Sequence, residues 1–114
     1  MTLIFKIVPK PLWQEAVEAN VFTGAPVDLS DGYIHFSTAE QVTETAAKHF
    51  TGQTDLLLAA FDAAQFGEDL KWEPSRGGAL FPHLYAKFAP GSALWVKELP
   101  LDEQGDHVFP ELSR

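Results

Sequence analysis

The sequence predicts an α+β fold, with two helices early in the chain and about six short strands. At 114 residues and 46% hydrophobic content, the chain can form one packed core and is too short for two ordinary domains. Residues 1–114 are therefore predicted to form a single compact domain. Helical patterns occur only in the first half, and a run of strand patterns follows, which disfavours a doubly wound parallel sheet.

The first strand is predicted at residues 3–8, where both faces are largely apolar. Lys6 interrupts one face, and two interpretations are open: a charge that protects an edge strand from aggregation, or a group on the wall of a cleft. Pro9 ends the strand, and Pro11 is typical of the first turn of a helix that runs to about Asn20. The apolar stripe of this helix is predicted to be Leu12, Trp13, Ala16 and Val17.

Residues 21–30 contain glycine and proline without a clear period, so they are predicted to form a loop. The next stretch, residues 31–38, reads Asp-Gly-Tyr-Ile-His-Phe-Ser-Thr and predicts a tight turn, a short strand and the cap of a helix. Alternation along that strand places Tyr33, His35 and Ser37 on one face and two apolar residues on the other. The stretch is therefore a candidate site.

Ser37 and Thr38 are alternative N-caps, because each has Glu or Gln three residues later. A second helix is predicted from there to about Phe50, and its first N–H groups would offer a place for an anion. His49 is interpreted as a partly buried packing residue of this helix.

The second half of the chain is predicted to be mainly strands. A nearly all-apolar run at residues 55–61 indicates a strand that is covered on both faces, followed by a turn or short helical piece. A short strand at residues 70–74 ends at a proline, and residues 75–79 form a glycine-rich loop. Two more strands are predicted at residues 83–88 and 93–99.

Composition excludes several classes of function. The net charge of −8 disfavours a nucleic-acid polymer as partner, since eight scattered Lys and Arg residues offer little to a phosphate backbone. The absence of cysteine excludes disulfides, thiolate nucleophiles and cysteine-based metal sites. With no apolar run of membrane-spanning length and no signal-peptide pattern, a cytoplasmic protein that binds a small molecule is expected.

A second motif, Phe-Pro-His-Leu-Tyr at residues 81–85, repeats the arrangement of the first, with His83 and Tyr85 on one face. Histidine titrates near neutral pH, so a pair of histidines is suited to acid–base catalysis. The sequence therefore predicts a cleft containing His35 and His83. The alternative is that each histidine only orients a loop through hydrogen bonds to the backbone.

Three other features complete the candidate site. Glu73 is a potential general base or hydroxyl-binding group, with a solvated charge at a strand end as the alternative. Arg76 lies beside two glycines and could close over an anion, although exposed loop arginines are common. His35, His83 and a nearby carboxylate have the right types for a metal site, but no close ligand spacing supports one, and no metal is expected.

Motifs spread over nearly the whole chain resemble a known family. They are Ile4-Phe5-Lys6-Ile7, Trp13, the residue 31–38 stretch, Gln41, residues 56–62, Trp72-Glu73 and the residue 81–85 stretch. Together they resemble the DUF952 family of small uncharacterised bacterial and plant proteins. That resemblance implies a fold like the ADP-ribosyltransferases, with a split, mostly antiparallel β-sheet and an NAD-binding cleft.

The resemblance can be followed through single residues. Lys6 is similar in position to the His or Arg that contacts the nicotinamide ribose, and residues 32–37 are similar to the segment that supports nicotinamide. His83 stands where the later strand of those enzymes carries a catalytic Glu. Ordinary ADP-ribosyl transfer is therefore not implied unless the fold brings Glu73 into the cleft.

These observations leave three functions open. The first is binding of NAD or another nucleotide-like anion, with or without its transfer or hydrolysis. The second is a two-histidine phosphoesterase, because His35-Phe36-Ser37 and His83-Leu84-Tyr85 resemble paired His-x-Ser/Thr motifs, with Tyr in the last position of the second. The third is a binding or regulatory module without activity. The candidate catalytic residues are His35, His83 and Glu73, and the candidate ligand-binding residues are Lys6, Tyr33, Ser37, Thr38, Arg76 and Tyr85.

Overall fold

The fold is built around strand β1, which lies inside a four-stranded antiparallel sheet. The computed structural model describes residues 1–113, apart from the side chain of Arg76. The strands are β1 (Leu3–Pro9), β2 (Ile34–His35), β3 (Ser37–Thr38), β4 (Leu56–Asp62), β5 (Leu70–Pro74), β6 (Leu80–Leu84) and β7 (Trp95–Glu98). The helices are α1 (Lys10–Ala19), α2 (Pro26–Asp31) and α3 (Val42–His49), with 3-10 turns η1 (Ala63–Asp69), η2 (Arg76–Gly78) and η3 (Pro90–Ser92).

The four-stranded sheet has the order β3-β1-β4-β7, and every neighbouring pair is antiparallel. β1 and β4 pair along their full length, from Leu3 opposite Asp62 to Pro9 opposite Leu56. Alternate side chains of these two strands enter two different apolar clusters. The sheet is thus covered on both faces, which explains why its central strands read as nearly continuous apolar runs.

The two clusters pack different elements onto the sheet. One contains Trp13 of α1 and Leu84 of β6, so it joins the sheet to α1 and to a second sheet. The other contains Val42 of α3, with Phe109 and Leu112 of the C-terminal segment packed against it. Each face of the central sheet is therefore covered by a helix from the first half of the chain together with a segment from the second half.

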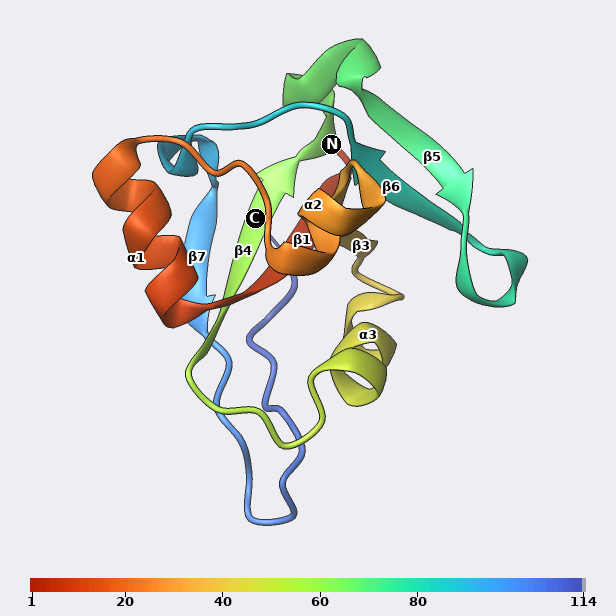
Figure 1. Ribbon diagram of the computed structural model, residues 1–114. Coiled ribbons are helices and arrows are strands. Elements are labelled where there is room, and N and C mark those ends of the chain that lie inside the picture. The colour runs from red at the N-terminus through yellow and green to blue at the C-terminus, as the bar shows by residue number, and fades with distance from the viewer. Residues whose placement is uncertain (114) are drawn as a thin grey trace.

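The second sheet has the order β2-β6-β5 and is also antiparallel. In Figure 1, β5 and β6 form a ribbon on the right, away from α1 on the left. β2 ends at His35 and β3 begins at Ser37, so the chain changes sheets across the single residue Phe36. The two sheets meet at this crossing, beside the residue 31–38 stretch.

The structure confirms the α+β class and antiparallel sheets, and it corrects several boundaries. Ser37 and Thr38 are not helix caps, because they pair with Phe5 and Ile4 of β1 as strand β3, and α3 begins only at Val42. The predicted loop at residues 21–30 is wrong, since α2 begins inside it. The described residues therefore contain three α-helices instead of two.

Smaller corrections concern packing. Lys6 does not protect an edge, because β1 is flanked on both sides, and its side chain is buried. Val17 is exposed and does not belong to the buried stripe of α1. His49 is exposed, so it is not a packing residue of α3. β6 ends at Leu84, four residues before the end of the predicted 83–88 strand. In the described part of the chain, no helix combines the length and apolar character that crossing a bilayer requires.

Candidate functional site

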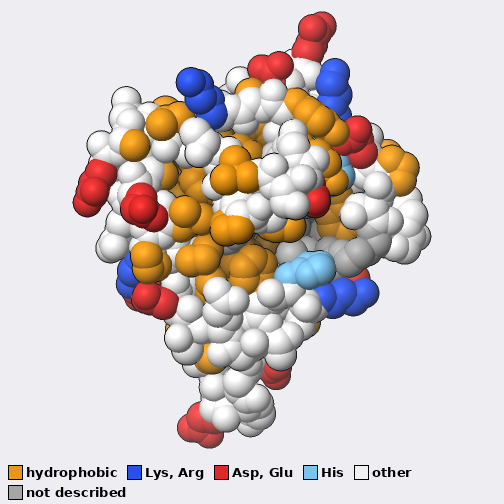
Figure 2. Space-filling view, in the orientation of Figure 1, with side chains coloured by type: hydrophobic (Ala, Val, Ile, Leu, Met, Phe, Trp, Pro, Cys, Tyr) orange, Lys and Arg blue, Asp and Glu red, His pale blue; other side chains and the backbone are white. Residues whose placement is uncertain are grey.

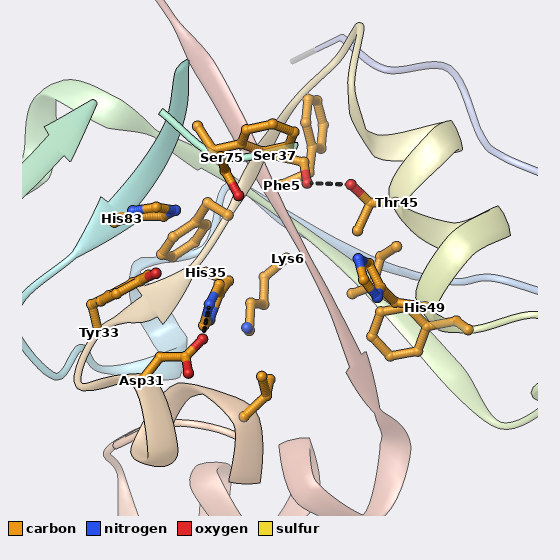
Figure 3. A pocket seen from close by; sticks show the side chains of 15 residues that line it. Phe5, Lys6, Asp31, Tyr33, His35, Ser37, Thr45, His49, Ser75 and His83 are labelled. Atoms are coloured by element: carbon orange, nitrogen blue, oxygen red, sulfur yellow. Dashed lines mark hydrogen bonds and ion pairs between the residues drawn. The ribbon is translucent and has the colours of Figure 1, made fainter. Parts of the chain in front are cut away.

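A pocket of about 510 Å³ opens where the two sheets meet. Its polar lining residues are Lys6, Asp31, Tyr33, His35, Ser37, Thr45, His49, Ser75 and His83. Its apolar lining residues are Phe5, Ile7, Val27, Phe36, Phe50 and Phe81. In Figure 3, Tyr33, His35 and His83 lie on one side, Thr45 and His49 on the other, and Lys6 between them. This size and mixed lining are typical of a small-molecule site.

The surface of the molecule also combines apolar and acidic groups. Figure 2 shows hydrophobic side chains gathered over the middle of one face, acidic side chains nearer its edge, and a histidine beside the hydrophobic area. Val27 of α2, which lines the pocket, is among the large apolar side chains that remain exposed. The pocket therefore has an apolar side that a ring-containing ligand could contact.

His35 and His83 form a direct cross-strand pair between β2 and β6. Their ring centroids are 5.6 Å apart, and Tyr33 stacks on His83 with its centroid at 4.1 Å. Side chains directly opposite in an antiparallel pair point to the same face. The strand register therefore brings together two histidines that are 48 positions apart in the chain, and both line the pocket.

His83 is held by a carboxylate outside the pocket. Its Nδ1 lies 2.9 Å from Oε1 of Glu73, and the hydroxyl of Tyr85 donates to the same oxygen at 2.7 Å. The hydrogen bonds from Tyr85 and His83 lower the pKa of Glu73, against a smaller opposing effect of burial. A carboxylate at Nδ1 favours the tautomer with hydrogen on Nδ1 and a lone pair on Nε2. Among the described residues, Nε2 of His83 has no hydrogen-bond partner. This is the arrangement of a general base.

His35 differs from His83 because both of its ring nitrogens face carboxylates. Nδ1 lies 2.6 Å from Oδ1 of Asp28, and Nε2 lies 2.9 Å from Oδ2 of Asp31. An ionised carboxylate only accepts hydrogen bonds, so both contacts are made together when both nitrogens carry hydrogen. Both ring nitrogens of His35 are thus placed to donate to carboxylates, and neither is left free to act as a base.

Asp28 is the buried centre of the polar network. Its two oxygens lie 3.0 and 2.9 Å from Nζ of Lys6, and they also accept the backbone N–H groups of Ala25 and His35. Burial by itself would raise the pKa of Asp28, but the hydrogen bond from His35, the charge of Lys6 and the two backbone donors lower it to about 2. Burial lowers the pKa of Lys6, while Asp28 opposes that effect. The network fixes a cation at the pocket wall.

The predicted site residues divide into three groups. Lys6, Tyr33, His35, Ser37 and His83 line the pocket together. The alternation predicted for the residue 31–38 stretch holds for Tyr33, His35 and Ser37, but Phe36, which was predicted on the opposite face, lines the pocket as well, and the predicted single strand is divided between two sheets. These positions do not by themselves assign the residues a role.

The other predicted residues lie elsewhere. Glu73 is next to the site but contacts it through His83, and Tyr85 is exposed and bonds to Glu73. Thr38 is absent from the pocket lining, and its backbone N–H donates to the side chain of Gln41. The side chain of Arg76 lies outside the described part of the structure. The predicted anion-binding site at a helix N-terminus directly after Ser37 is wrong, because Ser37 and Thr38 form a strand.

Sequence reasoning missed Asp28 as a site residue. Two signals were present: Pro26 followed by Asp28 is typical of a helix start, and Lys6 on a central strand needs a buried partner. Asp28 accepts the N–H of Ala25, the residue before α2, as an acid in the first turn of a helix commonly does. Thr45 was also missed. Its hydroxyl contacts that of Ser37 because β3 packs beside α3, and no local sequence pattern indicates this packing.

A sequence model of the family described as "Protein of unknown function (DUF952)" matches residues 7–96. The chain belongs to the DUF952 family. Two crystal structures of protein CC0527 from Caulobacter crescentus, one of a double mutant, share 48% sequence identity with this chain, each with a TM-score of 0.90 and coverage of 94% of both chains. A solution NMR structure of CC0527 shares 50% identity, with a TM-score of 0.84 over 93% of this chain and 91% of that one. No curated protein matches the chain. These matches confirm the DUF952 resemblance, and the similarity to ADP-ribosyltransferases stays a prediction.

Proposed function

We propose that this DUF952 protein binds a small nucleotide-like anion, such as NAD or ADP-ribose, and catalyses its hydrolysis or transfer with His83 as general base. The observation that carries the proposal is the His35–His83 pair on one pocket, in which one histidine is held as a donor and the other keeps a free Nε2. Different environments for two neighbouring titratable groups are typical of divided catalytic roles.

Each residue has a separate task in this proposal. Nε2 of His83 accepts the proton of a water or hydroxyl as its oxygen attacks the ligand and the bond to the leaving group breaks. Glu73 positions the ring through Nδ1 and stabilises the imidazolium that forms, which then gives its proton to the leaving group. Lys6 and His35 donate to the charged part of the ligand, while Tyr33 and the phenylalanines of the pocket contact its flat part. Thus Glu73 supports the reaction without entering the pocket, as a positioning residue.

Binding is tested by titrating the labelled full chain with NAD, ADP-ribose and a 2′,3′-cyclic nucleotide while amide shifts are recorded. The proposal expects NAD or ADP-ribose to move the signals of Lys6, residues 33–37 and His83. Product formation is then followed for each ligand that binds. The matched variants are His83→Gln, which removes the base, and His107→Gln, whose histidine contacts the backbone of Gln53 instead.

The expected result is a loss of turnover in His83→Gln on the order of 10²- to 10⁴-fold, with ligand affinity largely kept. His107→Gln should act like the parent. Turnover by His83→Gln at the parent rate would contradict the proposal, and so would silence toward all nucleotide ligands. Tight binding without turnover would favour the non-enzymatic module.

The two-histidine phosphoesterase makes a different demand. Such an enzyme needs a proton donor and a proton acceptor on the reacting phosphate, one from each histidine. Here both nitrogens of His35 face carboxylates, so His35 can take part in that exchange only after one of those carboxylates has moved away. If the parent hydrolyses the cyclic nucleotide and both His35→Gln and His83→Gln lose this activity, the phosphoesterase function is supported instead.

A further inference from the structure

The pocket contains a carboxylate whose negative charge disfavours the binding of an anionic ligand. Asp31 lies in the lining, with Oδ2 at 2.9 Å from Nε2 of His35. The two carboxylates Asp28 and Asp31 already accept from the donors Lys6 and His35 at this wall of the pocket. An anion that enters beside these groups meets no excess of positive charge while Asp31 stays in place.

We propose that Asp31 occupies the position of the ligand's anionic group, and that an anionic ligand binds by displacing this carboxylate from Nε2 of His35. The inference rests on the proposed function in one respect, that the pocket takes an anion. It goes further by naming the donor that the anion uses and the residue that competes for it. Asp31 thereby becomes a specificity-determining residue, since only groups that bind the imidazolium better than a carboxylate does can replace it.

The two carboxylates on His35 differ in a way that supports displacement of one and not the other. The side chain of Asp28 is 1% exposed and also binds Lys6 and two backbone N–H groups. The side chain of Asp31 is 44% exposed, and within the described structure His35 is the single partner of its carboxylate. An exposed ion pair of this kind contributes little free energy and is replaced at little cost.

The position of Asp31 at the end of a helix also allows its carboxylate to move away from His35. Asp31 is the last residue of the six-residue helix α2, and Gly32 follows with φ of 88°. A change of side-chain rotamer at Asp31 is enough to uncover Nε2, since the carboxylate already borders solvent. Nε2 of His35 then offers a charge-assisted hydrogen bond to a phosphate oxygen, near the ammonium of Lys6 at the same wall of the pocket.

The test compares three full-length proteins: the parent, Asp31→Asn and Asp106→Asn. Asp106 is exposed near the C-terminal end, and the structure shows only backbone hydrogen bonds for it, so its variant removes the same charge outside the pocket. The probes are inorganic pyrophosphate and ADP-ribose. Affinity is measured by calorimetry, and the ring-nitrogen signals of His35 are followed by ¹⁵N NMR.

Asp31→Asn should bind pyrophosphate on the order of tenfold more tightly than the parent, because a competing charge has been removed. The Nε2 signal of His35 should move on binding, and Asp106→Asn should match the parent. Equal or weaker pyrophosphate binding by Asp31→Asn overturns the inference. Weaker ADP-ribose binding by Asp31→Asn also overturns it, because Asp31 would then contact the ligand directly.

Failure of this inference and failure of the proposed function are distinguishable. ADP-ribose binding by all three proteins, with equal affinity of Asp31→Asn and the parent for both probes, rejects the displacement and keeps the nucleotide site. Tighter pyrophosphate binding by Asp31→Asn without any ADP-ribose binding keeps the displacement and rejects the nucleotide ligand. No binding of either probe to any of the three proteins rejects both.

Discussion

At the scale of single residues, Asp28 positions two side chains of the pocket wall, those of Lys6 and His35. It is buried, it pairs with Lys6, and it accepts both the backbone N–H and the ring nitrogen of His35. A buried carboxylate is tolerated only when its oxygens are satisfied in this way. The position of Lys6 and the orientation of His35 therefore depend on one residue, which lies in helix α2 and outside both sheets.

Replacing Asp28 should lower stability and change its dependence on pH. Asp28→Asn leaves the Lys6 ammonium buried without a counter-ion, so the free energy of unfolding at pH 7 should fall by about 3 kcal/mol or more. In the parent, the folded pKa of Asp28 is about 2 against an ordinary value of 3.8. The unfolded chain binds the proton first, so this stabilisation is complete above about pH 4 and is lost as the pH falls toward 2.

Urea unfolding between pH 7 and 2.5 measures both effects. The parent should lose about 2 kcal/mol over the acid range from Asp28 alone, and Asp28→Asn should lack that part of the slope. Asp106→Asn provides the control for loss of one acidic group. Equal stability of Asp28→Asn and the parent at pH 7 would mean that Lys6 finds another partner or loses its proton.

At the scale of elements, Gln41 joins α3 to both sheets. Its Oε1 accepts the N–H of Thr38 in β3, and its Nε2 donates to the carbonyl of Leu80 in β6. Gln41 is also the N-cap residue of α3. One amide side chain therefore sets the distance between the strand that carries Ser37, the strand that carries His83 and the helix at the pocket wall.

Gln41→Ala should loosen this junction. Loss of two hydrogen bonds, one of them to a partly buried N–H, should cost about 1–2 kcal/mol and speed amide exchange at Thr38. Hydrogen exchange followed by NMR gives the local effect, and urea unfolding gives the global one. Gln65→Ala, which removes one long surface hydrogen bond to Ser92, should leave the Thr38 amide unchanged. An unaltered Thr38 exchange rate in Gln41→Ala would show that β1 alone protects this amide.

Some of these elements could be predicted from the sequence, and others could not. β1 and β4 are recognisable because burial on both faces leaves a continuous apolar run, and Trp13 on α1 is buried as predicted. The Thr38–Gln41 pair does carry half of a capping box, but Thr38 uses it as a strand residue, since the edge of β1 needs a partner. Long-range pairing overrides local helix signals in this way.

The site was predictable only in part for the same reason. Alternation put His35 and Ser37 on one face, and the repeated motif indicated His83. The contacts that give these residues different roles come from Asp28, Asp31 and Glu73, which reach them through strand register and the position of α2. No local pattern encodes those distances.

At the scale of the whole molecule, two apolar clusters on opposite faces of one sheet are the main source of stability. Leu58 of β4 is fully buried in the cluster with α3, and Leu84 of β6 is fully buried in the cluster with α1. Because β1 and β4 contribute to both clusters, neither can be lost while the other remains intact. Unfolding should therefore be a single cooperative transition.

Leu58→Ala and Leu84→Ala test this coupling. Each should lower the free energy of unfolding by about 2–5 kcal/mol and shift one common transition. Leu80→Ala, at an exposed position, should change it by less than about 0.5 kcal/mol. Fluorescence and circular dichroism transitions that separate in either core variant would mean that the two faces unfold independently.

The change of sheet across Phe36 has a practical consequence for finding a ligand. Lys6 belongs to the four-stranded sheet and His83 to the three-stranded sheet, so a molecule that binds both crosslinks the two halves of the fold. Such a molecule binds the native state and not the unfolded chain, and a ligand at 100 times its Kd adds about 2.7 kcal/mol to the native state. The melting temperature of the protein is thus itself a sensor of its ligand, and a metabolite collection can be ranked by heating alone, before any reaction is assumed.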